Sequence, residues 1–198
     1  MATATPWTFD LCAGHVALDF ANTVSDRPSS EPIDRLRDYG DLVRFAVQTG
    51  ITTKTAARSL LRRAESDPAS AERTLAAARA LREALYDLFF AQAAGSTPNG
   101  RDVELVDAAW HRLSLDSDFH WTWTDGPEAL DSMFGPIVES AVTLLTAGPR
   151  DRVRTCESDT CQWVFLDTSK NRSRRWCDMK QCGNREKARR FQERARAT

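Results

Sequence analysis

Four cysteines near the end of this 198-residue chain restrict its structure more than any other feature. They form two equally spaced pairs, with four residues between Cys156 and Cys161 and four between Cys177 and Cys182. The fifteen residues between the pairs leave room for a short hairpin, and a helix can follow the second pair. Such a fold brings four sulfurs to the corners of a tetrahedron, the arrangement that Zn²⁺ prefers. We therefore expect one structural zinc ion.

Other interpretations of the cysteines stay open from the sequence. Two disulfides or four unrelated thiols fit less well, because the five cysteines are an odd number and no secretion signal is evident. Iron bound by four thiolates is also compatible. A catalytic zinc is not expected, since four protein ligands leave no open position and His15, His111 and His120 all lie far from the pairs in sequence. Cys12 is expected to be a small buried hydrophobic residue rather than a nucleophile.

The segment between the two pairs contains the apolar residues of the expected finger. Alternation along a strand puts Trp163 and Phe165 on one face and Val164 and Leu166 on the other, and with Trp176 these would form a miniature core. A segment of this size buries too little apolar surface to offset its chain entropy, so it needs a metal to fold.

The remainder of the chain predicts a mainly α fold with a small β element. Apolar residues recur at helical spacing in 57–64, 68–89, 103–113 and 127–147. The last of these helices is expected to begin at Pro127, since proline suits a first helical turn. Residues 119–124 instead alternate with period two, as in a half-buried strand or hairpin arm.

Charge and pattern change at the same point of the chain. Residues 150–198 contain 14 Lys and Arg against 7 Asp and Glu, whereas residues 1–149 contain 13 against 21. We therefore expect a helical domain over 1–149 and a zinc finger over 150–198. With no secretion signal and no apolar stretch long enough to cross a bilayer, we expect a cytoplasmic protein without a membrane partner.

Basic residues gather around the cysteine pairs and predict contact with a polyanion. Candidates for nucleic-acid contact are Lys170, Arg172, Arg174, Arg175, Arg185, Lys187, Arg189 and Arg190. Guanidinium groups pair well with phosphate, so DNA is the expected partner. A solvated charged face is an alternative, and so is docking on an acidic protein or on the acidic body of a second copy, which would give a homodimer.

The cysteine-containing strings resemble a known family. They comprise Arg152-Val153-Arg154-Thr155-Cys156, Trp163-Val164-Phe165-Leu166-Asp167, Asn171 through Met179, and Cys182-Gly183-Asn184-Arg185, and together they resemble the CGNR zinc finger. Upstream, Gly14 and the segment Leu18-Asp19-Phe20-Ala21-Asn22-Thr23 resemble the opening of the ABATE domain. The resemblance implies a bacterial, stress-induced transcription regulator with a helical N-terminal domain and a zinc finger that binds DNA.

A second polar group lies within the ABATE-like opening. Asp19, Asn22 and Thr23 fall within one helical turn and Arg27 follows one turn later, so the four could line a pocket for a small-molecule effector. They could equally cap a helix and fix the adjoining loop. An enzyme is not expected, because no paired carboxylates, phosphate loop or activated nucleophile stands out.

Overall fold

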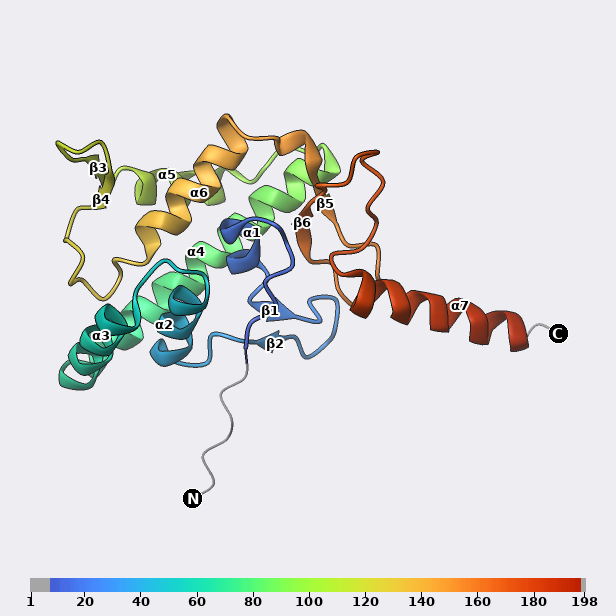
Figure 1. Cartoon of the computed structure of the whole chain (residues 1–198), viewed down its shortest axis with the longest axis horizontal. Helices are drawn as coiled ribbons and strands as arrows, with labels where there is room; N and C mark the ends of the chain where they lie inside the picture. The colour runs from blue at the N-terminus through green and yellow to red at the C-terminus, as the bar shows by residue number, and fades with distance from the viewer. Residues whose placement is uncertain (1–7, 197–198) are drawn as a thin grey trace, which may run out of the picture.

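The computed structural model describes residues 8–196 and places one long helix, α4, at the centre of a mostly helical body (Figure 1). Helices α1, α2, α3 and α5 pack against α4. The α-helices are α1 (Val16–Ala21), α2 (Tyr39–Gln48), α3 (Lys54–Ser66), α4 (Pro68–Ala94), α5 (Gly100–Trp110), α6 (Phe134–Thr146) and α7 (Asn184–Arg196). The prediction of a mainly α fold that ends in a small four-cysteine finger is confirmed.

Three short antiparallel hairpins complete the described part of the chain. Their strands are β1 (Val24–Ser25) with β2 (Ile33–Asp34), β3 (Leu113–Leu115) with β4 (Trp121–Trp123), and β5 (Val153–Thr155) with β6 (Val164–Leu166). A 3₁₀ turn, η1 (Arg150–Arg152), precedes β5, and a π turn, η2 (Met179–Gly183), precedes α7. The strand predicted within 119–124 is confirmed as β4, which pairs with β3.

Polar caps explain where the main helices begin. In each of four helices, the side chain just before the first turn accepts a hydrogen bond from a backbone N–H of that turn. The caps are Asp38 for α2, Thr53 for α3, Asp67 for α4 and Asn99 for α5. Because Pro68 follows the Asp67 cap and needs no N–H partner, α4 begins at the step predicted from the sequence.

Two predicted helix boundaries were wrong. Helix α6 begins at Phe134 rather than at Pro127, and the intervening residues form turns. Pro136 explains the later start, because its ring is tolerated in a first turn but would break a helix that already extended past it. Helix α5 ends at Trp110, so Leu113 is not on the predicted helix but in β3.

The finger does not have a core of its own. Val164 and Phe165 are completely buried and belong to the same apolar cluster as Phe20 of α1 and Leu85 of α4. All three residues of β6 are buried, since this strand packs against α1 and α4. The miniature core predicted around Trp176 is therefore part of the main core. The domain boundary near residue 149 stays a prediction.

Across residues 8–196, no helix combines the length and the apolar character needed to cross a bilayer.

Candidate metal centre and the surfaces around it

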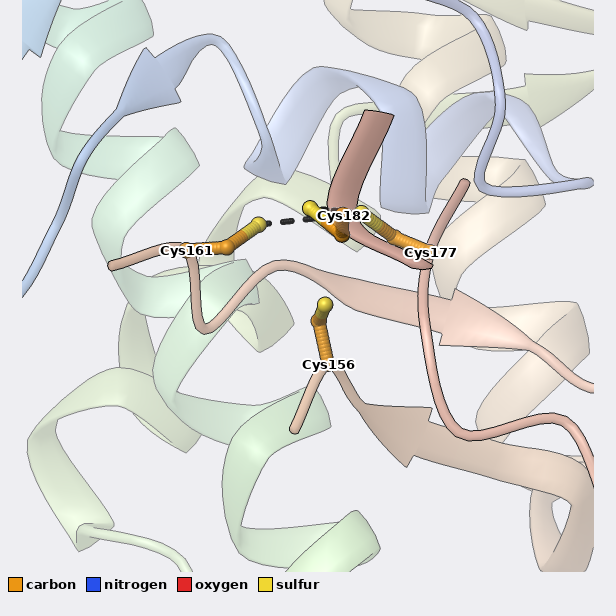
Figure 2. A group of neighbouring side chains, drawn as sticks. All are labelled: Cys156, Cys161, Cys177 and Cys182. Atoms are coloured by element: carbon orange, nitrogen blue, oxygen red, sulfur yellow. Dashed lines mark hydrogen bonds between the residues drawn. The ribbon is translucent and has the colours of Figure 1, made fainter. Parts of the chain in front are cut away.

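Four separate segments bring the paired cysteines together. Figure 2 shows the four side chains pointing toward one another, and their sulfurs all lie within 4.8 Å of one another. The Sγ of Cys177 lies 3.6 Å from that of Cys161 and 3.7 Å from that of Cys182. All four cysteines are buried, with Cys156 at the end of β5 and Cys182 in the π turn η2.

These distances fit a tetrahedral metal site and not disulfides. Zn–S bonds of about 2.3 Å place the sulfurs of a tetrahedron about 3.8 Å apart, whereas a disulfide needs about 2.0 Å. Hydrogen bonds from the thiols of Cys161, Cys177 and Cys182 lower the pKa of Cys156, which prepares this sulfur to serve as a thiolate. The donor set therefore suits Zn²⁺. With four protein ligands, the ion would hold the finger together without an open position for substrate.

Backbone hydrogen bonds shape the loops that carry the ligands. The N–H of Cys156 donates to the carbonyl oxygen of Trp163 at 2.8 Å, and the N–H of Cys161 closes a turn onto the carbonyl oxygen of Ser158 at 3.0 Å. Gly183 faces Met179, and a Cβ at this position would lie 2.7 Å from the Met179 sulfur. Glycine after Cys182 therefore leaves room for the Met179 side chain against the π turn.

Arg174 is turned into the protein, which the sequence did not indicate. Its Nε donates to the carbonyl oxygen of Trp176 at 3.0 Å, and its Nη2 donates to the carbonyl oxygens of Cys12 and Cys177. The guanidinium also lies over the ring of Phe165, 4.7 Å from its centroid. The structure thus gives Arg174 a role in holding the cysteine loop against the N-terminal segment, unlike the nucleic-acid contact predicted for it.

The other seven predicted basic residues lie on the surface in two groups. Arg172, Arg175 and Arg189 form ion pairs, with Asp151, with Glu157 and with the acids around Glu186, respectively. The remaining four are exposed and make no ion pair within residues 8–196; they are Lys170, Arg185, Lys187 and Arg190. Of these, Arg185 donates a hydrogen bond to the Thr160 hydroxyl. These four side chains are therefore the most available for an anionic partner.

Helix α7 carries most of this available charge away from the body. It begins directly after Gly183 and extends to one side of the molecule (Figure 1). Every side chain from Lys187 to Ala195 is exposed, and Phe191 retains 74% of its accessible surface. At the base of the helix, the buried Glu186 accepts a hydrogen bond from the Ser158 hydroxyl at 3.1 Å. This bond joins α7 to the loop between Cys156 and Cys161.

The four polar residues of the ABATE-like opening mainly make internal bonds. Asn22 bonds both backbone groups of Val164, accepting from the N–H at 3.0 Å and donating to the carbonyl oxygen at 2.8 Å. Thr23 donates to the carbonyl oxygen of Phe20 at 2.8 Å. Arg27 pairs with Glu83 at 2.7 Å. These contacts match the alternative in which the group fixes neighbouring structure.

Two of the four also line a cavity where the body meets the finger. Asp19 and Asn22 border a space of about 350 Å³ together with Arg35 and Trp163. Trp163 is anchored there because its Nε1 donates to the carbonyl oxygen of Val24 at 2.7 Å. The structure thus separates the predicted group, since Thr23 and Arg27 are not part of this cavity lining.

Asp19 predicts a pH effect on stability. Burial raises the pKa of Asp19 to about 6 from 3.8, although a hydrogen bond from the Ala13 N–H opposes the rise. Because the folded pKa is raised, protonation favours the folded state, and this contribution is lost as pH increases from about 4 to about 6. We expect Asp19→Asn, which keeps an oxygen acceptor, to gain about 2 kcal/mol relative to the wild type between pH 4 and pH 7.5. Urea denaturation at both pH values measures this difference, and parallel pH profiles for the two proteins would contradict it.

Two family models match the chain. Residues 14–148 match the ABATE family, described as "Putative stress-induced transcription regulator", and residues 152–195 match the CGNR zinc finger. No curated protein matches the sequence. The two matches confirm the resemblance of the cysteine strings and of the segment after Gly14, and the first covers more than half of the chain. The chain belongs to the ABATE family and carries a CGNR zinc finger at its C-terminal end.

Proposed function

We propose that this protein is a transcription regulator that binds DNA through a finger held by one zinc ion, and that it acts by binding rather than by catalysis. The observation that carries the proposal is the position of α7, which begins at the cysteine cluster and presents its basic side chains to solvent from Arg185 to Arg194. A metal that fixes the base of α7 thereby fixes the orientation of these charges. Arginine and lysine on an exposed helix are suited to phosphate contacts beside a groove.

The charge distribution also favours contact between DNA and the end of the molecule that carries α7. Residues 150–198 have an excess of seven positive charges and the remainder of the chain an excess of eight negative charges. A polyanion would therefore be attracted to the end of the molecule that carries α7 and repelled by the helical body. The resulting encounter places the finger, and not α2 or α3, against the phosphates.

Salt dependence tests the DNA contact. If the finger neutralises about five phosphates, the logarithm of the affinity should fall with the logarithm of salt concentration with a slope of about −4 to −5. Lys187→Gln combined with Arg190→Gln should make this slope shallower by about 2 and weaken binding on all DNA sequences alike. Fluorescence anisotropy with random-sequence duplexes and zinc-loaded protein measures both effects.

A matched control removes the same charge elsewhere. Arg58 and Arg62 lie exposed on α3, at the opposite end of the molecule from α7 (Figure 1). Arg58→Gln with Arg62→Gln should leave the slope unchanged. Absence of DNA binding by the zinc-loaded protein, or an equal effect of the two double variants, would contradict the proposal.

A second candidate is a zinc-stabilised module that binds another protein without touching DNA. Its supporting observation is the 74% exposure of Phe191 on the otherwise charged helix α7, since a large exposed apolar side chain is typical of a protein contact. Phe191→Ala separates the two candidates. The protein-binding candidate expects altered assembly in analytical ultracentrifugation with DNA affinity absent throughout, whereas the DNA-binding candidate expects the salt slope above to persist.

We also propose that the helical body gives the regulator its response to stress, in the cytoplasm, through a small effector. The cavity beside Asp19 and Asn22 supports this, because an effector there would contact Trp163 of the finger as well as the body. Metabolite screening by thermal shift tests it. A hit should lose its stabilising effect in Asp19→Ala, and a screen without hits would argue against the effector.

A further inference from the structure

The fifth cysteine, Cys12, lies beside the metal cluster although it is 144 residues before the first of the paired cysteines in sequence. The Cys12 thiol lies close enough to the Cys177 thiol to raise the pKa of Cys177. The backbones agree with this contact, because Nη2 of Arg174 donates to the carbonyl oxygens of both cysteines, at 3.0 Å for Cys12. One guanidinium nitrogen therefore holds the backbones of Cys12 and Cys177 near each other.

A small cavity opens onto the same sulfurs. It has a volume of about 130 Å³, and its lining includes Cys12 together with Cys161, Cys177 and Cys182. Cys12 is only partly buried, whereas all four cluster cysteines are buried. A molecule about the size of water, which occupies about 30 Å³ in the liquid, can therefore reach Cys12 first.

We propose that Cys12 is an oxidation site at which a hydroperoxide forms a Cys12–Cys177 disulfide and thereby releases zinc from the finger. In the first step the Cys12 thiolate attacks one peroxide oxygen, the O–O bond breaks, and Cys12 becomes a sulfenic acid while one water leaves. In the second step the Cys177 thiolate attacks the Cys12 sulfur, the S–O bond breaks, and the hydroxyl group leaves as water. Two thiols and one hydrogen peroxide thus give one disulfide and two waters, with two electrons passing to the oxidant.

Loss of Cys177 from the cluster leaves three sulfurs for the metal. The π turn that carries Cys182 and the start of α7 would then lose their fixed position. This step deepens the proposed function, because it supplies a way to turn off the DNA-binding surface, and it rests on that function only for this consequence. Cys12 lies outside both matched stretches, 14–148 and 152–195.

The test uses the full-length zinc-loaded protein and no DNA. Hydrogen peroxide is added, zinc release is followed with a chromogenic chelator, and the products are digested with trypsin without reduction. Cleavage separates Cys12, in the peptide that ends at Arg35, from Cys177 in residues 176–180 and from Cys182 in residues 181–185. We expect a cross-link between the first two peptides that forms in step with zinc release and disappears with dithiothreitol.

Two variants complete the test. Cys12→Ser should release zinc at least about fivefold more slowly, because the accessible thiol is gone. Met179→Leu controls for oxidation of the half-exposed Met179 near Gly183 and should release zinc at the wild-type rate. Equal release rates in wild type and Cys12→Ser, or cross-links confined to the four cluster cysteines, would overturn the proposal. The cross-link in the wild type decides the question even if Cys12→Ser folds poorly.

Discussion

Removal of zinc, by a chelator or by Cys177→Ser, is expected to unfold the finger and to destabilise the helical body with it. Zinc binding supplies apparent free energies of about 10–16 kcal/mol in finger peptides, as much as the whole unfolding free energy of a typical domain. The body is affected because β6 is buried against α1 and α4, so that loss of the finger exposes core residues such as Phe20. Hydrogen exchange should therefore increase over 153–183 and, to a smaller degree, in α1.

Zinc content and melting temperature provide the control for this prediction. Cys12→Ser should bind the metal fully, since Cys12 is not one of the four clustered sulfurs. It should therefore melt close to the wild type. Metal-free protein with unchanged exchange over 153–183 would show that the sulfurs contribute by packing alone and that the metal site has no structural role.

Asn22→Ala is expected to cost about 2–5 kcal/mol of unfolding free energy. The Asn22 side chain satisfies the N–H and the carbonyl oxygen of Val164, and both residues are buried. Each buried backbone group left without a partner costs about 1–3 kcal/mol, and alanine leaves two of them. Urea denaturation with zinc in excess measures the effect without interference from metal loss.

Thr23→Val is the matched control for Asn22→Ala. Thr23 is equally buried and next in sequence, but its hydroxyl donates only to the carbonyl oxygen of Phe20 in its own segment. Valine keeps its shape, so the cost should be about 1 kcal/mol. Equal costs at the two positions would mean that the hydrogen bonds from Asn22 to β6 contribute no more to stability than the local bond of Thr23. A larger cost for Asn22→Ala identifies Asn22 as the polar link between body and finger.

Local sequence signals were sufficient to predict most of the helices in the body. The N-caps Asp67 and Asn99 act within a few residues of their own helix, so the starts of α4 and α5 follow from neighbouring sequence. The predicted start of α6 was wrong because Pro127 and Pro136 both fit the first turn of a helix. The helix starts near Pro136, and the residues before it make contacts that are distant in sequence. One is the hydrogen bond from the Tyr39 hydroxyl to the carbonyl oxygen of Leu130 at 2.8 Å.

The sequence by itself determined the four-cysteine cluster, because two equally spaced cysteine pairs can converge on one tetrahedral site through short loops. It also determined the helical class through apolar periodicity. Only the tertiary structure decided the contacts that join finger and body. Asn22 and Val164 are separated by 142 residues, and Cys12 and Arg174 by 162. No local pattern specifies such pairs, since each depends on packing that brings a particular side chain to a particular buried backbone group. For the same reason the sequence did not indicate that Arg174 holds the cysteine loop against the N-terminal segment.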